Sequence, residues 1–158
     1  MAPESDDERY LLRAIELARL SRENGNHPFG SVLVDANGRV VLEAENTVVT
    51  GRDVTGHAEL NLVRAASAQL DVAALEGATL YASTEPCAMC SGAIYWSGIG
   101  RVVYALSTEA LTAMVEGPGA STLTLSCREV FARGGRSVGV SGPQLTEQAA
   151  AVHLGFWD

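Results

Sequence analysis

Apolar residues near the start of the chain recur every three or four positions, which is the spacing of a helix with one buried face. The helix is predicted to end near Glu23, because Asn24-Gly25-Asn26 follows and glycine suits a helix C-terminus. Ser5 and Glu8 fit the capping box that opens a helix. The buried face is expected to consist of Leu11, Leu12, Ile15, Ala18 and Leu20.

Shorter apolar runs bounded by turn residues predict strands in the rest of the chain. The segments 30–35 and 40–49 flank Ala36-Asn37-Gly38 and are expected to form a hairpin. Three further strands are predicted at 78–83, 101–105 and 137–141. Helices are predicted at 57–68, 86–97, 107–115, 127–133 and 143–154, with a loop at 73–77.

The order of these elements indicates the fold class. Helices alternate with strands after an initial hairpin, a pattern typical of α/β proteins. We therefore expect a three-layer α/β/α sandwich, in which a mixed sheet of five strands carries helices on both faces. With 158 residues and no repeat or linker, the chain is expected to form a single domain over residues 1–158.

Composition narrows the class of protein. No apolar run approaches the roughly 18 residues of a membrane span, and Met1 to Arg9 is too polar for a secretory signal. Three cysteines, two of them in one C-x-x-C, argue against a disulfide scaffold and favour a cytoplasmic protein. The net charge is −8, and all 11 basic residues are arginine. This balance disfavours nucleic acid as a partner, because phosphate backbones are bound by basic surfaces.

The run Pro86-Cys87-Ala88-Met89-Cys90 has the features of a metal clamp. Proline suits the first turn of a helix, and two cysteines three positions apart lie on one helix face. The helix N-terminus favours thiolates, which are zinc ligands. If the predicted helices at 57–68 and 86–97 pack side by side, His57 joins Cys87 and Cys90 around one zinc ion.

Other interpretations of these residues are possible. A structural zinc normally has four protein ligands, but the remaining candidates (Cys127, His27 and His153) are single and distant in the sequence. The histidine and cysteines could also be ordinary core residues. A catalytic zinc is favoured, because three ligands leave one position for water and Glu59 supplies a base two positions beyond His57.

The two motifs together resemble a known signature. His57-Ala58-Glu59 with Pro86-Cys87-Ala88-Met89-Cys90 matches the H-x-E…P-C-x-x-C pattern of zinc nucleobase deaminases. His27–Val34 is similar to a strand of guanine and tRNA adenosine deaminases, and Thr84–Trp96 to a longer run of guanine deaminases. The chain thus resembles the zinc-dependent cytidine/deoxycytidylate deaminase superfamily, and within it guanine deaminase-like enzymes most. The resemblance covers about Leu12 to Ala105 and is weak beyond.

This resemblance implies a role for each motif residue. His57, Cys87 and Cys90 are expected to hold one Zn²⁺ per subunit, which activates a water molecule. Glu59 is expected to transfer protons from that water to the ring and to the departing ammonia.

The same resemblance implies substrate contacts. Asn46 is expected to hydrogen-bond the ring, Phe29 to form a wall, and Ala58 to lie against the substrate. Phe156 and Trp157 are expected to close over a small substrate, although Phe29, Phe156 and Trp157 could equally be packing residues.

Three functions remain open at this point. Hydrolytic deamination of a free nucleobase or related heterocycle is favoured, with a guanine-like ring ahead of cytosine and an aminotriazine possible. Wobble deamination of tRNA adenosine is the alternative, but the acidic composition argues against it. A zinc-binding module without catalysis is least favoured, because Glu59 and all three ligands occur together. By resemblance, a homodimer is expected.

Overall fold

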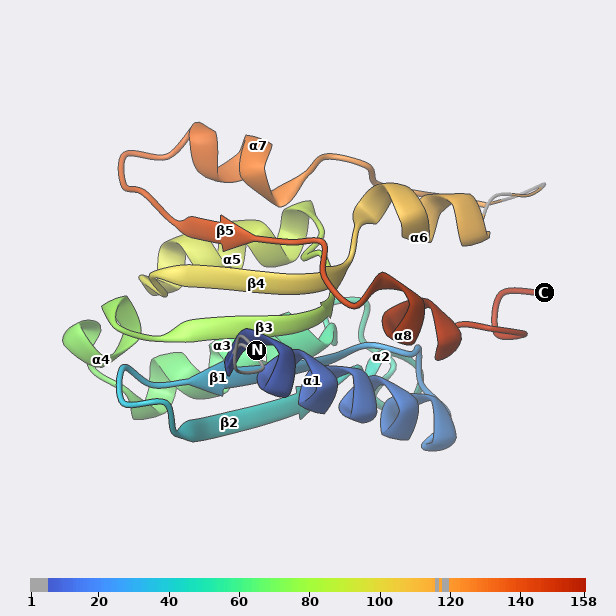
Figure 1. Cartoon of the computed structure of the whole chain (residues 1–158), viewed down its shortest axis with the longest axis horizontal. Coiled ribbons are helices and arrows are strands. Elements are labelled where there is room, and N and C mark those ends of the chain that lie inside the picture. Colours follow the sequence, from blue (N-terminus) through green and yellow to red (C-terminus); the bar gives the residue numbers. More distant parts are fainter. Residues whose placement is uncertain (1–5, 116, 118–119) are drawn as a thin grey trace, which may run out of the picture.

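A computed structural model describes residues 6–115, 117 and 120–158 (Figure 1). Its five strands form one sheet in the order β2-β1-β3-β4-β5. β1 runs antiparallel to β2 and β3, whereas β3, β4 and β5 run parallel. The predicted mixed sheet is therefore confirmed. Its strands are β1 (Gly30–Val34), β2 (Val40–Glu45), β3 (Thr79–Thr84), β4 (Arg101–Leu106) and β5 (Gly139–Ser141).

Helices cover both faces of the sheet, as the sequence predicts (Figure 1). One face packs against α1 (Asp6–Glu23), α6 (Thr108–Val115) and α8 (Thr146–Ala151). The other face packs against α3 (Ala58–Gln69), α5 (Ala88–Ser97) and α7 (Cys127–Ala132). The predicted cap of α1, Ser5, lies outside the described residues.

The alternation of side chains along the central strands produces these two cores. Leu33 pairs with Leu80, and Leu80 with Val102, so these three side chains share the face toward α3 and α5. Their neighbours in the sequence point the other way, toward α1, and are Val32, Tyr81 and Val103.

Three predicted elements differ from the structure. Residues 73–77 were expected to form a loop, but α4 (Val72–Glu76) forms there because the Asp71 carboxylate accepts a hydrogen bond from the Ala74 N–H at 2.8 Å. The final helix was expected to span 143–154, but α8 begins only after Leu145, whose left-handed backbone (φ 53°) breaks any earlier helix. The strand predicted at 40–49 ends at Glu45, and a short helix, α2 (Val48–Gly51), forms beyond it, where the side chains of Asn46 and Asn26 accept hydrogen bonds from the N–H groups of residues 48–50.

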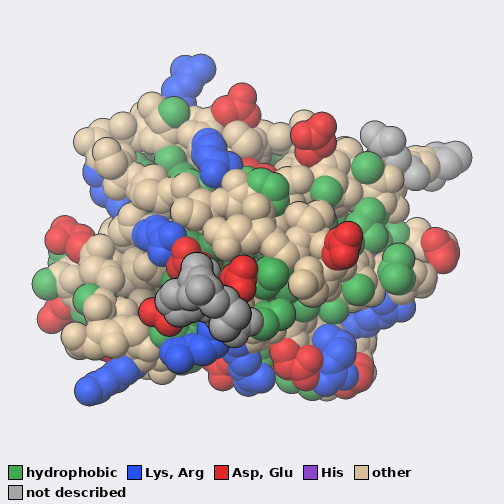
Figure 2. All heavy atoms as spheres, viewed as in Figure 1, with side chains coloured by type: hydrophobic (Ala, Val, Ile, Leu, Met, Phe, Trp, Pro, Cys, Tyr) green, Lys and Arg blue, Asp and Glu red, His purple; other side chains and the backbone are tan. Residues whose placement is uncertain are grey.

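The fold brings two helix N-termini together. β3 ends at Thr84 and α5 begins at Ala88, while α3 begins at Ala58 and packs against α5 on the same face of the sheet. The residues that precede these helices therefore lie near one another. None of the described helices is long and apolar enough to span a membrane. On the face drawn in Figure 2, arginine and carboxylate side chains are interspersed, without a continuous basic area.

Candidate active site

The three predicted metal ligands come together at the N-termini of α3 and α5. His57 directly precedes α3 and Cys87 directly precedes α5, both with extended backbones, and neither side chain caps its own helix. Cys90 lies in the first turn of α5 and is buried. The ligand atoms of the three residues all lie within 4.8 Å of one another.

The separations between these atoms fit a zinc ion. Nδ1 of His57 lies 3.6 Å from Sγ of Cys87 and 3.5 Å from Sγ of Cys90. Tetrahedral zinc, with its usual bond lengths to nitrogen and sulfur, separates a nitrogen and a sulfur ligand by about 3.6 Å. Within the described part of the chain, the cluster consists of these three residues, which leaves the fourth position of a tetrahedral ion free.

Hydrogen bonds within the cluster also favour the thiolate form of Cys87. A hydrogen bond from Cys90 lowers the pKa of Cys87 to about 4, against the opposing effect of burial. The same contact and burial raise the pKa of Cys90. The hydrogen bond to Cys87 raises the pKa of His57. To hold zinc, both sulfurs would be thiolates and the imidazole neutral, so these three residues would release the protons that they share.

Glu59 lies in the first turn of α3 and is only 5% exposed. Burial, together with the negative charge of Cys87, raises the pKa of its carboxyl group to about 7. The start of α3 is held to the sheet by the Ser31 hydroxyl, which donates to the Ala58 carbonyl at 2.9 Å. Glu59 is thus a buried carboxyl group held beside the metal ligands.

Two spaces with lining residues in common lie at this site. The inner cavity has a volume of about 100 Å³ and is lined by Phe29, His57, Glu59, Thr84, Glu85, Cys87 and Leu111. A larger outer groove of about 740 Å³ shares His57, Glu85, Cys87 and Leu111 with the inner cavity. Further lining of the groove includes Met89, Thr108, Leu123 and Trp157. The metal ligands His57 and Cys87 therefore line both an open groove and, beside it, a space of about one small ring.

Of the residues predicted to contact substrate, Phe29 and Trp157 are among the residues that line these spaces, whereas Phe156, Asn46 and Ala58 are not. Phe29 lines the inner cavity and Trp157 lines the outer groove. Phe156 packs edge-on against Trp157, with ring centroids 4.7 Å apart. Asn46 is 1% exposed, and its Oδ1 accepts a hydrogen bond from the Val48 N–H at 3.0 Å. Ala58 is fully buried at the start of α3.

Some residues at the site were not predicted from the sequence. Glu85 lines both spaces, and its carboxylate accepts hydrogen bonds from the backbone N–H groups of Thr108 and Cys127, each at 3.0 Å. Its position directly before Pro86 in the sequence could have identified Glu85 as a site residue. Leu111 and Thr84 complete the inner cavity. Leu111 carries no such signal, because it lies beyond Ala105, where the sequence resemblance is weak.

Comparison with known proteins identifies the family. Residues 4–106 match the family model for the cytidine and deoxycytidylate deaminase zinc-binding region. The chain belongs to this family. It is 42% identical over 154 residues to a probable cytosine deaminase of Schizosaccharomyces pombe, which covers 96% of this chain and 93% of the relative.

Two further comparisons cover other branches of the family. A tRNA-specific adenosine deaminase of Bacillus subtilis is 40% identical over 100 residues, which cover 63% of this chain and 62% of that protein. The solved structure of guanine deaminase from Nitrosomonas europaea matches with a TM-score of 0.74 and 27% identity, over 90% of this chain and 80% of that one. The cytidine deaminase-like fold is confirmed, and the protein is a zinc-dependent deaminase whose zinc ligands are His57, Cys87 and Cys90.

Proposed function

We propose that this deaminase acts on a free nucleobase, with a cytosine-like pyrimidine as its first candidate substrate. The observation that carries the proposal is the inner cavity, where Glu59, Phe29 and two zinc ligands surround about 100 Å³. An engineered protein cavity that holds one benzene molecule measures about 150 Å³, so this space has the scale of a single ring. The relative that matches along almost the whole chain, a probable cytosine deaminase, supports the same choice.

Each group at the site has a chemical task. Zinc, when bound, acts as a Lewis acid that makes water nucleophilic near neutral pH. Glu59 is buried in the cavity next to the metal ligands, where its carboxylate accepts a proton from water and delivers it to a ring nitrogen or to the leaving amine. Burial of Glu59 limits its contact with bulk solvent, which strengthens its electrostatic interactions with a bound ring. The products are ammonia and the corresponding oxo-base.

The predicted substrate contacts extend this proposal. Phe29 forms one wall of the ring site, and Trp157 with Phe156 closes its outer side. Asn46 lines neither space, but while its Oδ1 already accepts one hydrogen bond from Val48, its Nδ2 group supplies donors for a ring. A ring carbonyl, such as O2 of cytosine, is the matching acceptor. Ala58, between His57 and Glu59 in the chain, is not among the residues that line either space.

A guanine-like base, which the sequence favoured, is the second candidate. The larger ring system needs more room than the inner cavity offers, but the outer groove shares the lining residues His57, Cys87 and Leu111 with it. The structural similarity to guanine deaminase of Nitrosomonas europaea supports this candidate.

Two other functions are less well supported. The similarity to a tRNA-specific adenosine deaminase extends over only 63% of the chain, and a net charge of −8 opposes binding to a polyanion. A zinc module without catalysis does not explain the buried Glu59 in the same cavity as the ligands.

Ammonia release from a panel of compounds tests the proposal. The panel contains cytosine, guanine, adenine, isoguanine, aminotriazines, the matching nucleosides and a tRNA anticodon stem-loop. We expect turnover of cytosine above that of its nucleoside and of the stem-loop. A higher kcat/KM for guanine than for cytosine would support the second candidate. Turnover of the stem-loop alone would refute the proposal.

We also propose that the protein forms a homodimer through α5. Met89, Ala93 and Trp96 follow one another at helical spacing, and Trp96 is 84% exposed. A β-carbon at Gly92, on the same part of the helix, would meet no atom within 4 Å, so the surface there is open. An apolar helix face of this kind is buried most simply against a second copy of itself, related by a twofold axis.

A further inference from the structure

The C-terminal segment after α8 ends in a cluster of aromatic and imidazole rings. Trp157 lies 5.9 Å from His27, 6.3 Å from Phe29 and 4.7 Å from Phe156, measured between ring centroids. Phe29 lines the inner cavity, whereas Trp157 lines the outer groove. The cluster therefore joins the end of the chain to both parts of the substrate site.

One hydrogen bond sets the orientation of Trp157 in this cluster. Its Nε1–H donates to Nδ1 of His153 at 3.1 Å, and the two rings are nearly parallel, with an interplanar angle of 15°. His153 is 1% exposed and packs edge-on against Phe29 at 5.4 Å. The buried imidazole is therefore fixed by its surroundings, and it holds the half-buried indole in place.

The accepting nitrogen defines the state of His153. Since Nδ1 accepts the indole proton, the neutral imidazole carries its own proton on Nε2. Among the described residues, Nε2 has no hydrogen-bond partner. The contact with Trp157 is therefore the polar interaction that the structure provides for this buried ring.

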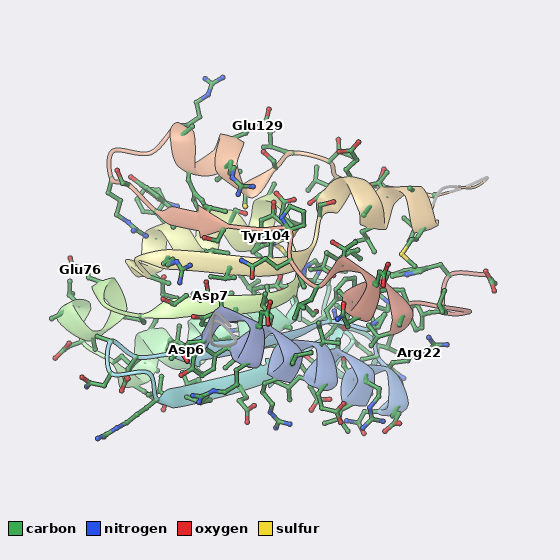
Figure 3. The ribbon with its side chains drawn as sticks, in the orientation of Figure 1. Asp6, Asp7, Arg22, Glu76, Tyr104 and Glu129 are labelled. Atoms are coloured by element: carbon green, nitrogen blue, oxygen red, sulfur yellow. The ribbon has the colours of Figure 1, made fainter. Side chains whose placement is uncertain are left out.

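The backbone on either side of His153 is anchored independently. Nη1 of Arg22 donates to the carbonyl of Val152 at 2.9 Å and to that of Leu154 at 2.7 Å. Figure 3 shows Arg22 at the end of α1, beside the C-terminal segment. The guanidinium also lies over the ring of Phe156, 5.4 Å from its centroid. α1 thus fixes the backbone of the segment, while His153 fixes the side chain that faces the groove.

We propose that His153 is a positioning residue that holds the Trp157 indole over the outer groove and so sets the affinity for substrate. The proposal rests on the proposed function, because it assigns Trp157 to the substrate side of the same site. His153 lines neither space and acts only through the indole. Loss of the hydrogen bond frees the indole to rotate, which weakens binding while Glu59 and the zinc ligands stay in place.

Steady-state kinetics test this role. His153→Phe keeps an aromatic ring but removes the acceptor, and Trp157→Phe removes the donor. Each is expected to raise KM by about fivefold, the effect of one ordinary hydrogen bond, with kcat changed less than twofold. His153→Gln retains an acceptor oxygen, so its KM is expected to equal that of the wild type. Leu154→Ala, at a 68% exposed neighbour, is the matched control with unchanged kinetics.

The double variant shows whether His153 and Trp157 act through their mutual contact or affect KM independently. If His153 acts through Trp157, His153→Phe with Trp157→Phe has the KM of either single variant. Multiplied effects of the two changes would overturn the proposal. An unchanged KM in Trp157→Phe would also overturn the proposal. This variant changes a half-buried side chain that lies outside the two core clusters.

Fluorescence provides a test that needs no turnover. The chain contains two tryptophans, so Trp157 is the sole emitter in a Trp96→Phe background. Adding His153→Phe is expected to increase quenching of Trp157 by acrylamide, whereas adding His153→Gln leaves quenching as in the parent. Equal quenching in all three proteins would overturn the proposal. If the protein released no ammonia from any base, the proposed function would fail, but this measurement would still decide whether His153 holds Trp157.

Discussion

The backbone N–H of Cys127 donates a hydrogen bond to Oε2 of Glu85 at 3.0 Å, between residues 42 positions apart in the chain. The other carboxylate oxygen accepts from the N–H of Thr108, also at 3.0 Å. One buried carboxylate therefore joins the N-termini of α6 and α7, and it lies two residues before the zinc ligand Cys87. Its negative charge is favourable at both positive helix ends.

Replacing Glu85 by glutamine is expected to destabilise the protein by about 1–3 kcal/mol, because the new amide NH₂ faces one of the two N–H donors and leaves it unpaired. A thermal melt should show a fall in Tm of roughly 2–4 °C for each kcal/mol lost. Glu109→Gln, an exposed carboxylate in the first turn of α6, is the matched control. A Glu85→Gln melt equal to that of the control would show that the two hydrogen bonds contribute nothing.

Glu59→Gln tests the proposed proton transfer. The amide has nearly the same shape but cannot accept and release a proton, so kcat is expected to fall by roughly 10³-fold while zinc remains bound. Zinc content and ammonia release are measured on the same sample. Glu76→Gln, on the exposed side of α4 and labelled in Figure 3, is the control. Loss of zinc from Glu59→Gln would instead identify Glu59 as a ligand.

The zinc ligands could be predicted from the sequence because each motif is local. His57 and Cys87 directly precede helices, and a short spacing fixes Cys90 on the same helix as Cys87. The contacts of Glu85 and Arg22 could not be predicted in this way. They join residues 23 to 132 positions apart, and only the packed fold determines that they meet. The same is true of the inner cavity, which Leu111 completes from a segment of weak resemblance.

Removing any one zinc ligand should abolish both metal binding and turnover. His57→Ala, Cys87→Ala and Cys90→Ala leave two ligands, too few for a stable site. Elemental analysis is expected to give one zinc per chain for the wild type and well under one for each variant. Cys127→Ala removes a fully buried thiol from the core near α7 and should keep its zinc. Full zinc content in any of the three ligand variants would contradict the assigned ligand set.

His153 gives the stability a defined dependence on pH. Burial, and then the charge of Arg22, lowers the pKa of His153 to about 4, whereas an unfolded histidine titrates near 6.5. Between these values the unfolded state binds more protons, so stability falls as the pH decreases from 6.5 toward 4. The full contribution is on the order of 3 kcal/mol.

Urea unfolding at several pH values measures this contribution. Other groups titrate in the same range, so the informative quantity is the difference between the wild type and His153→Gln, which has no titrating group at this position. The free energy of unfolding of the variant is expected to fall less steeply below pH 6.5. Parallel curves for the two proteins would show that His153 has an ordinary pKa in the folded state.

The proposed dimer is tested at Trp96. Trp96→Glu places a charge at the C-terminal end of the apolar face of α5, where burial against a second copy would leave it unpaired. Light scattering is expected to give twice the chain mass of 16.6 kDa for the wild type and the single mass for the variant. Val72→Glu, at a 69% exposed apolar residue of α4, is the control and should remain dimeric. A wild-type mass of one chain at micromolar concentration would refute the dimer, whatever the variant shows.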